Sequence, residues 1–199
     1  MPPRIVCNTG PLVALSLLGL ENMLAELFRP IIPRAVLTEW LDGDKGRTLP
    51  DGVNVIENPP MDPLLMLQLD AGEAAVIQTA INQSIPTVLI DERKGRKIAR
   101  RVYGLRTIGT ARVLVEAKKA RLVMEVAPLF ETLKEEFYWI ADPIVCWRLE
   151  EAISTSSMGS GNIGSSILRR GPWRCWLSHR DSMCSLFALD AEKGRPPVY

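Results

Sequence analysis

The chain has 199 residues, of which 47% are hydrophobic and 24% charged, with a formal net charge of +1. This is the composition of an ordinary globular protein with its own core, and the overall charge neither favours nor excludes a nucleic-acid partner. Four cysteines without a C-x-x-C spacing and a single histidine argue against a zinc site. We expect a cytoplasmic protein, since no signal peptide precedes the first predicted strand and the apolar stretch Pro11–Leu20 is too short to span a membrane.

The first third of the chain alternates predicted strands and helices. Arg4–Asn8 is a β-rich run closed by Thr9-Gly10-Pro11, the strand–turn–helix order typical of α/β proteins. Pro11–Gly19 and Leu20–Phe28 predict short helices. The next predictions are a strand at Pro30–Pro33, a helix at Arg34–Leu41, a strand at Val53–Ile56 and a proline-rich surface loop at Asn58–Pro63.

The stretch Asp70–Arg101 organises the rest of the chain. Asp70 is placed to cap a helix with an apolar face, and Thr87–Ile90 is too short and too β-branched to be anything but a strand. This strand ends on Asp91-Glu92 and is followed by a basic helix. A strand that is apolar on both faces implies a parallel sheet, and such sheets place their chemistry beyond the carboxyl ends of the strands.

The last third predicts a strand at Leu105–Ile108 and helices at Ala111–Ala120, Val126–Glu136 and Asp142–Ala152. From Ser154 the composition changes to a Ser/Gly-rich run and a segment without a sustained period. We therefore expect a domain at residues 1–153, followed by a linker and an irregular tail at 154–199.

Five oxygen-bearing side chains are predicted at one rim of the sheet. They are Asn8, Glu39, Asp70, Glu73 and Asp91. Carboxylates gathered there would repel one another unless a divalent cation neutralised them. Oxygen ligands without His or Cys favour Mg²⁺ or Mn²⁺, and phosphoryl transfer is the chemistry that most often uses such sites.

Each of these residues also has a purely structural interpretation. Asp70-x-x-Glu73 has the spacing of a capping box, which would satisfy the first turn of the helix without catalysis. Glu39 could be a solvated helix residue, and Asn8 could satisfy the turn after the first strand. Asp91 is the hardest to explain structurally, because an acid that ends a buried strand faces the rim.

The helix after Asp91 is strongly basic. It carries Arg93, Lys94, Arg96, Lys97, Arg100 and Arg101 without interleaved aromatic residues. The alternatives are a solvated helix face and a patch that contacts phosphates without reading bases. No G-x-G-x-x-G or G-K-[ST] loop is present, which disfavours nucleotide binding of those types.

Five segments together resemble a PIN domain, and more closely the PIN-related family usually described as predicted nucleic-acid-binding proteins. They are IVCNTGPLVALSLLG at 5–19, IIPRAVLTEW at 31–40, LDAGEAAVIQTA at 69–80, LIDERKGRKIARR at 89–101 and IGTARVLVEAKKARLV at 108–123. The resemblance implies a three-layer α/β/α fold with a central parallel sheet. It also implies cleavage of RNA with Mg²⁺ or Mn²⁺, a small antitoxin protein as partner, as in toxin–antitoxin pairs, and a possible homodimer.

The resemblance also assigns roles to residues. Glu39, Glu73 and Asp91 match the catalytic, metal-binding acids, and Asn8 matches the acid that ends the first strand, where most PIN nucleases have Asp. Thr9, Asp70 and Thr110 would support these ligands without contacting the ion. The basic residues Arg93, Lys94, Arg96, Lys97 and Arg100 would hold RNA.

Three functions follow as hypotheses. The first is a metal-dependent ribonuclease, and the second is a catalytically weakened PIN domain that binds RNA or protein, which the amide at Asn8 motivates. The third is another phosphatase-like α/β fold, which is less favoured because no Asp-x-Asp follows the first strand.

Overall fold

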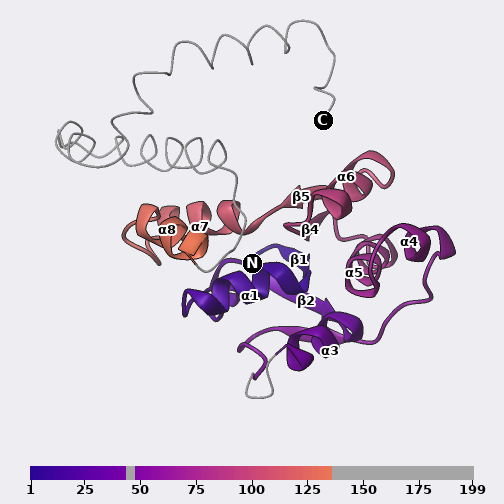
Figure 1. Ribbon diagram of the computed structural model, residues 1–199, viewed down its shortest axis with the longest axis horizontal. Helices are drawn as coiled ribbons and strands as arrows, with labels where there is room; N and C mark the ends of the chain where they lie inside the picture. The colour runs from indigo at the N-terminus through magenta and orange to yellow at the C-terminus, as the bar shows by residue number, and fades with distance from the viewer. Residues whose placement is uncertain (44–47, 136–199) are drawn as a thin grey trace, which may run out of the picture. The chain divides into compact units, whose positions relative to one another are not determined.

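The structure is a computed structural model, and it describes residues 1–43 and 48–135. Within them, five short strands form one parallel sheet with the order β3-β2-β1-β4-β5 (Figure 1). The strands are β1 (Arg4–Cys7), β2 (Arg29–Pro33), β3 (Asn54–Ile56), β4 (Thr87–Leu89) and β5 (Arg106–Ile108). In the register of the central strand β1, Val6 is opposite Ile31 of β2 and Val88 of β4. The parallel sheet predicted from the apolar run before Asp91 is confirmed.

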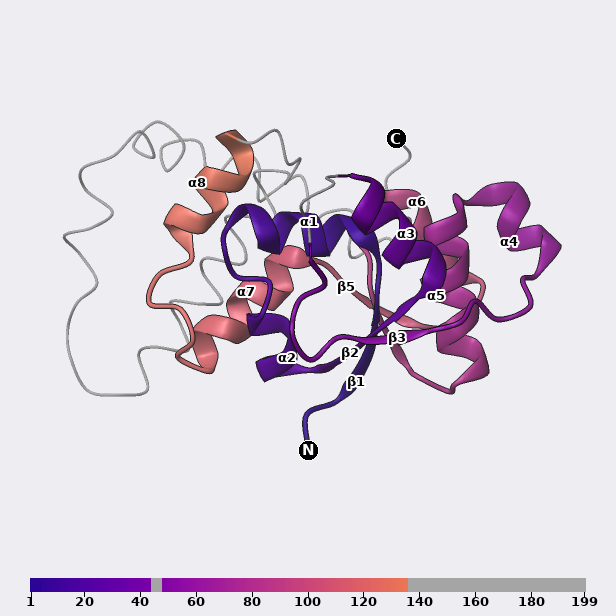
Figure 2. The ribbon, with the colours of Figure 1, turned by 90° about the horizontal axis from the view of Figure 1, so that it is seen from below.

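Helices cover both faces of this sheet. They are α1 (Thr9–Leu17), α2 (Met23–Leu27), α3 (Arg34–Asp42), α4 (Pro63–Gln68), α5 (Ala71–Asn82), α6 (Arg93–Arg101), α7 (Thr110–Lys119) and α8 (Ala127–Glu135). Figure 2 shows α1, α2 and α7 on one side of the strands and α4, α5 and α6 on the other. Helix α3 contacts both α1 and α5, so it joins the two helical layers at one end of the sheet. The three-layer α/β/α fold is confirmed.

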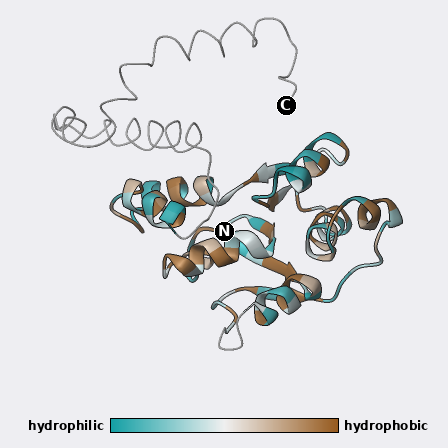
Figure 3. Ribbon diagram, viewed as in Figure 1, coloured by the Kyte–Doolittle hydropathy of each residue, from teal (hydrophilic) through white to brown (hydrophobic). Residues whose placement is uncertain are grey.

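The core forms around the central strand and helix α5. Ile5, Val6 and Cys7 of β1 are completely buried, and so are Val76 and Ile77 of α5. Helix α6 differs, because only Gly95 and Ala99 among its residues are buried, and Figure 3 shows it largely hydrophilic. The fold therefore leaves one side of α6 in contact with solvent next to the carboxyl ends of β4 and β5.

The sequence predicts most elements to within a few residues, and the proline-rich loop expected at Asn58–Pro63 is present up to Asp62. The sequence predicts no helix after this loop, but the structure has α4 there, in which Pro63 is the first residue and the Asp62 side chain accepts a hydrogen bond of 2.9 Å from the Leu64 amide. An aspartate cap followed by proline is a helix start signal that the proline-rich context obscures.

Several predictions fall outside the described residues. The helix expected at Asp142–Ala152 and the linker and tail at 154–199 belong to this group. In the part of the chain that is described, no helix combines the length and hydropathy needed to cross a bilayer.

Candidate acidic site at the carboxyl edge of the sheet

The predicted site residues lie at or just beyond the carboxyl ends of β1, β2 and β4. Asn8 directly follows β1, and its backbone amide donates a hydrogen bond of 2.9 Å to the carbonyl of Leu89, the last residue of β4. Asp91 comes two residues after this strand. Glu39 lies on α3, which begins where β2 ends, and Glu73 lies in the first turn of α5. Parallel strands thus bring residues from four parts of the chain to one edge.

Glu39 lies between the first turns of two helices. Its Oε2 accepts a hydrogen bond of 2.5 Å from the hydroxyl of Thr9, the first residue of α1. On its other side is Gly72 of α5, where an added β-carbon would lie 2.5 Å from both carboxylate oxygens. Glu39 is therefore not a solvated helix residue, because contacts with α1 and α5 fix its carboxylate.

Glu73 is the most perturbed acid of the site. Only 3% of its surface is exposed, and its Oε1 accepts no hydrogen bond within the described residues. Burial is the main cause that raises the pKa of Glu73 to about 7, with further contributions from the negative charges of Asp70, Glu92 and Glu39 and an opposing one from Lys94. Its carboxyl group packs against Gly95 of α6. Glu73 therefore lies in an excess of negative charge with one oxygen unpaired.

Asp91 fixes the start of α7. Its Oδ1 accepts a hydrogen bond of 2.8 Å from the Thr110 amide, and its Oδ2 accepts one of 2.6 Å from the Thr110 hydroxyl. A β-carbon on Gly109 would lie 2.6 Å from Asp91 Oδ1 and 3.6 Å from an Nη1 atom of Arg96. Asp91 thus has a structural task that the sequence pattern did not reveal, since it ties α7 to the end of β4.

Asn8 contributes a second unpaired oxygen. The residue is 9% exposed, and its Oδ1 accepts no hydrogen bond from the described part of the chain. Buried polar atoms are normally paired, and leaving one unpaired costs about 1–3 kcal/mol. The unpaired oxygens of Asn8 and Glu73 are hard donors in a negatively charged setting, and this chemistry fits a divalent cation.

The acids do not form a complete metal-binding site in this conformation. Across residues 1–43 and 48–135, no group of three or more His, Cys, Asp or Glu side chains is close enough to hold a metal ion. The negative charge of Glu39 contributes to the raised pKa of Glu73, whereas Asp91 is held by Thr110. Carboxylates repel one another when no cation lies between them. Two of the three are instead held by threonine hydroxyls, Glu39 by Thr9 and Asp91 by Thr110.

Asp70 has the capping role that its spacing predicts. Its Oδ1 accepts a hydrogen bond of 2.7 Å from the Glu73 amide, which satisfies a free donor in the first turn of α5. Asp70 also adds negative charge beside the Glu73 carboxyl group. It therefore acts on the site through Glu73.

The basic residues of α6 separate into two groups. Five are exposed on the helix surface, namely Arg93, Lys94, Lys97, Arg100 and Arg101. The Arg100 guanidinium donates a hydrogen bond of 2.9 Å to the Thr107 hydroxyl. Arg96 is half-buried near Gly109 and Asp91, so it belongs to the acidic site as much as to the exposed surface.

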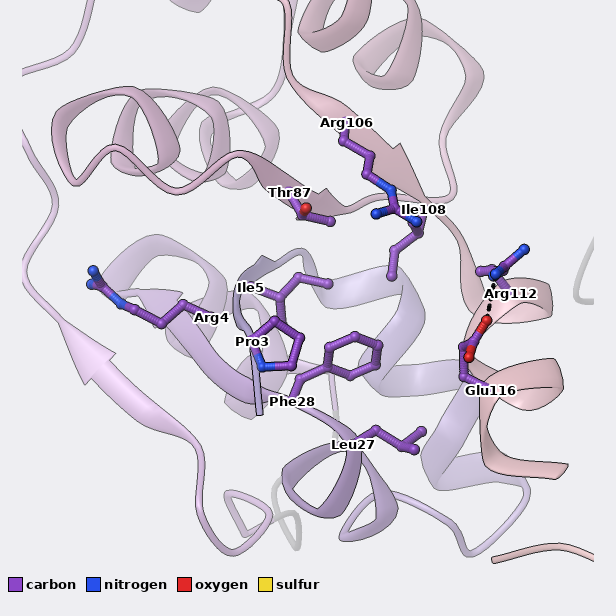
Figure 4. Close-up of a pocket in the computed structure, with 10 residues that line it drawn as sticks. All are labelled: Pro3, Arg4, Ile5, Leu27, Phe28, Thr87, Arg106, Ile108, Arg112 and Glu116. Atoms are coloured by element: carbon purple, nitrogen blue, oxygen red, sulfur yellow. Dashed lines mark ion pairs between the residues drawn. The ribbon is translucent and has the colours of Figure 1, made fainter. Parts of the chain in front are cut away.

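Figure 4 shows a pocket near the amino ends of the strands, away from the candidate acids at the carboxyl ends. It has a volume of about 370 Å³, and the first residues of three strands, Arg4, Thr87 and Arg106, contribute to its lining. Phe28 and Ile108 supply apolar surface, and Arg112 forms a 2.5 Å ion pair with Glu116. None of the candidate acids lines this pocket.

The comparison with protein families agrees with the fold and the edge described above. A family model described as a PIN domain matches residues 4–154, which is most of the chain. A search among curated proteins finds no match. The fold is thus of nuclease type, PIN domains generally depend on divalent metals, and the family points to nucleic-acid binding. On this match and the parallel α/β/α architecture, the chain belongs to the PIN-domain family.

Proposed function

We propose that this protein is a Mg²⁺- or Mn²⁺-dependent ribonuclease that hydrolyses RNA phosphodiesters. The observation that carries the proposal is the Glu73 carboxyl group, which is buried with one oxygen unpaired among the charges of Asp70, Glu92 and Glu39. A buried acid without a partner lowers the stability of the fold, and acids with strongly shifted pKa values cluster at functional sites. A divalent cation would remove both the charge excess and the missing contact.

Four side chains would hold the cation. Glu39, Glu73 and Asp91 would supply charged oxygens, and Asn8 would supply a neutral one. When bound, such an ion activates water and neutralises charge that develops on the phosphate. Thr9 and Thr110 would orient Glu39 and Asp91, since each threonine hydroxyl donates to one carboxylate.

The substrate would be held by the exposed side of α6. Lys94 and Lys97 are exposed on a helix that begins two residues after Asp91, so a phosphate bound by them would lie close to the acids. Cations on a helix without aromatic residues contact the nucleic-acid backbone and read no bases. This arrangement favours a nucleic-acid backbone as the bound group, and the resemblance to PIN nucleases makes RNA the proposed substrate.

Cleavage of single-stranded RNA tests the proposal. We expect the parent protein to cleave RNA in Mn²⁺ or Mg²⁺ and to lose this activity in EDTA. Asp91→Asn, which keeps an acceptor for Thr110, should reduce the rate more than about 100-fold, since a metal ligand supports several kcal/mol of charge stabilisation. The matched control Asp51→Asn changes an exposed aspartate and should leave the rate unchanged. Equal rates for the parent and Asp91→Asn would refute the assignment.

A second candidate is a PIN domain that binds RNA or protein without efficient cleavage. It is favoured by Asn8, because an amide in place of a carboxylate removes one negative charge from the cation ligands. Asn8→Asp discriminates between the two. If cleavage and Mn²⁺ binding appear only in Asn8→Asp, the natural protein is a binder, and if the parent already cleaves, it is a nuclease.

We also propose that the nuclease acts in the cytoplasm as the toxin of a toxin–antitoxin pair, in which a small antitoxin protein and a second copy of the chain are partners. The support is the resemblance of the five sequence segments to PIN toxins. Induced expression of the parent should arrest growth, whereas expression of Asp91→Asn should not. Growth arrest by both proteins, or by neither, would contradict a toxin that acts through its nuclease site.

A further inference from the structure

We propose that three glycines are positioning residues of the acidic site, each leaving the space that one carboxyl group occupies. The pairs are Gly72 with Glu39, Gly95 with Glu73, and Gly109 with Asp91. Each glycine belongs to the beginning of a different helix, and each acid comes from another element. This inference deepens the proposed function, on which its metal-binding part rests, while its steric part concerns the fold alone.

Backbone conformation does not explain these glycines. Gly52 and Gly104 have φ angles of +75° and +64°, where glycine is favoured because it lacks a β-carbon. Gly72, Gly95 and Gly109 are not among the residues with positive φ, and Gly95 lies inside a helix, where alanine would be more favourable. We therefore look for a steric reason for glycine at these three positions.

Close approach of a carboxyl group supplies this requirement. A β-carbon on Gly72 would lie 2.5 Å from each carboxylate oxygen of Glu39, and one on Gly95 would lie 2.8 Å from the carboxyl carbon of Glu73. At Gly109 the corresponding distance to Asp91 Oδ1 is 2.6 Å. These distances are below van der Waals contact, so any larger residue would displace the acid. Glu73 is 97% buried and has little space into which it could move.

The same approach brings each acid to the positive end of a helix. Gly72 is the second residue of α5, Gly95 the third residue of α6, and Gly109 the N-cap of α7. The first turn of a helix carries partial positive charge and unpaired amides, which favour a nearby carboxylate. At α7 this is seen directly, because the Thr110 amide donates to Asp91.

The missing hydrogen-bond partner of one buried oxygen supports a ligand at the contact between Gly95 and Glu73. The Glu73 atom that lies nearest to the space beside Gly95 is Oε1, and this buried oxygen accepts no hydrogen bond from the described residues. If Gly95 served only to let two helices pack, an apolar side chain could stand in place of Glu73. Helix packing alone therefore does not explain a buried carboxyl oxygen without a hydrogen bond. We infer that the space beside Gly95 keeps the unpaired Glu73 carboxyl group at the acidic site, where it would serve a cation.

A double-mutant cycle tests the steric part in EDTA, with thermal unfolding as the readout. Gly95→Ala alone should lower the melting temperature by about 2–10 °C through overpacking. It should do the same in Glu73→Gln, which keeps the size of the side chain. In Glu73→Ala the clash is gone, so Gly95→Ala should have no effect or raise the melting temperature. An equal loss in all three backgrounds would overturn the proposal, because the alanine would then clash with something else.

Manganese binding, measured by calorimetry, tests the metal-binding part. Gly95→Ala should weaken Mn²⁺ binding about 10–100-fold, as changes beside a ligand do, whereas Arg101→Ala on the exposed side of the same helix should not. Unchanged affinity in Gly95→Ala would overturn the positioning role. If the parent itself binds no Mn²⁺, the proposed function fails, and the unfolding cycle still decides the role of the glycine.

Discussion

Replacing Glu73 by glutamine should stabilise the metal-free protein, by an amount that grows as the pH rises above about 4.5 and is largest above about pH 7. Burial and neighbouring acids raise the pKa of Glu73 in the folded protein from its ordinary 4.5 to about 7. Between these two values the folded protein keeps a proton that the unfolded chain releases. The parent therefore loses stability as the pH rises through this window, and the loss is complete above about pH 7.

The magnitude follows from the two pKa values. Their difference is about 2.5, and each pKa unit corresponds to 1.36 kcal/mol, so the free energy of unfolding should fall by ~3 kcal/mol. Glutamine has the same shape but no proton to lose. Glu73→Gln should therefore match the parent near pH 4 and exceed it by up to ~3 kcal/mol at pH 8.

Urea unfolding followed by circular dichroism, in EDTA at several pH values, measures this difference. The exposed Glu131 on α8 offers a matched control, and Glu131→Gln should change the free energy of unfolding by less than about 0.5 kcal/mol at every pH. Added Mn²⁺ should restore stability to the parent at pH 8, because the cation favours the charged carboxylate. A difference between Glu73→Gln and the parent that does not change with pH would refute the reasoning.

Three further predictions concern the contacts around the acids. Thr110→Val removes the hydroxyl that donates to Asp91 and should cost about 1–3 kcal/mol in urea unfolding, and an unchanged midpoint would mean that Asp91 does not hold α7. Asp70→Ala should lose about 1 kcal/mol of thermal stability through the missing cap, whereas Asp70→Asn should lose much less, and equal losses would rule out capping. Lys97→Glu should weaken RNA binding, measured by fluorescence anisotropy, and should reduce the slope of log affinity against log salt concentration. The same affinity and the same slope as in the parent would exclude a phosphate contact.

Local sequence patterns predict much of the fold because they reflect local physics. The apolar run Thr87–Ile90 forms β4, and Asp70 caps α5 as its spacing from Glu73 predicts. Strand ends also place Asn8 and Asp91 at one edge, because parallel strands share their direction. The helix α4 was missed because the prolines around Asp62 are more typical of a loop.

Contacts between distant residues could not be predicted in this way. The tie between Asp91 and Thr110 spans 19 residues and depends on the pairing of β4 with β5. The burial of Glu73 depends on the packing of α5 against α6, and neither hydrophobic periodicity nor capping patterns indicate it. Gly95 inside a basic helix was the one visible signal, because glycine is unfavourable there without a reason.

The central claim is that separate parts of the chain form one negatively charged site for a divalent cation. The most direct measurement is anomalous X-ray scattering from crystals of the protein soaked in Mn²⁺. The account predicts an ion bound by carboxylate oxygens of Glu39, Glu73 and Asp91, with the Asn8 amide oxygen facing it. An ion elsewhere on the protein, or none at millimolar Mn²⁺, would contradict it.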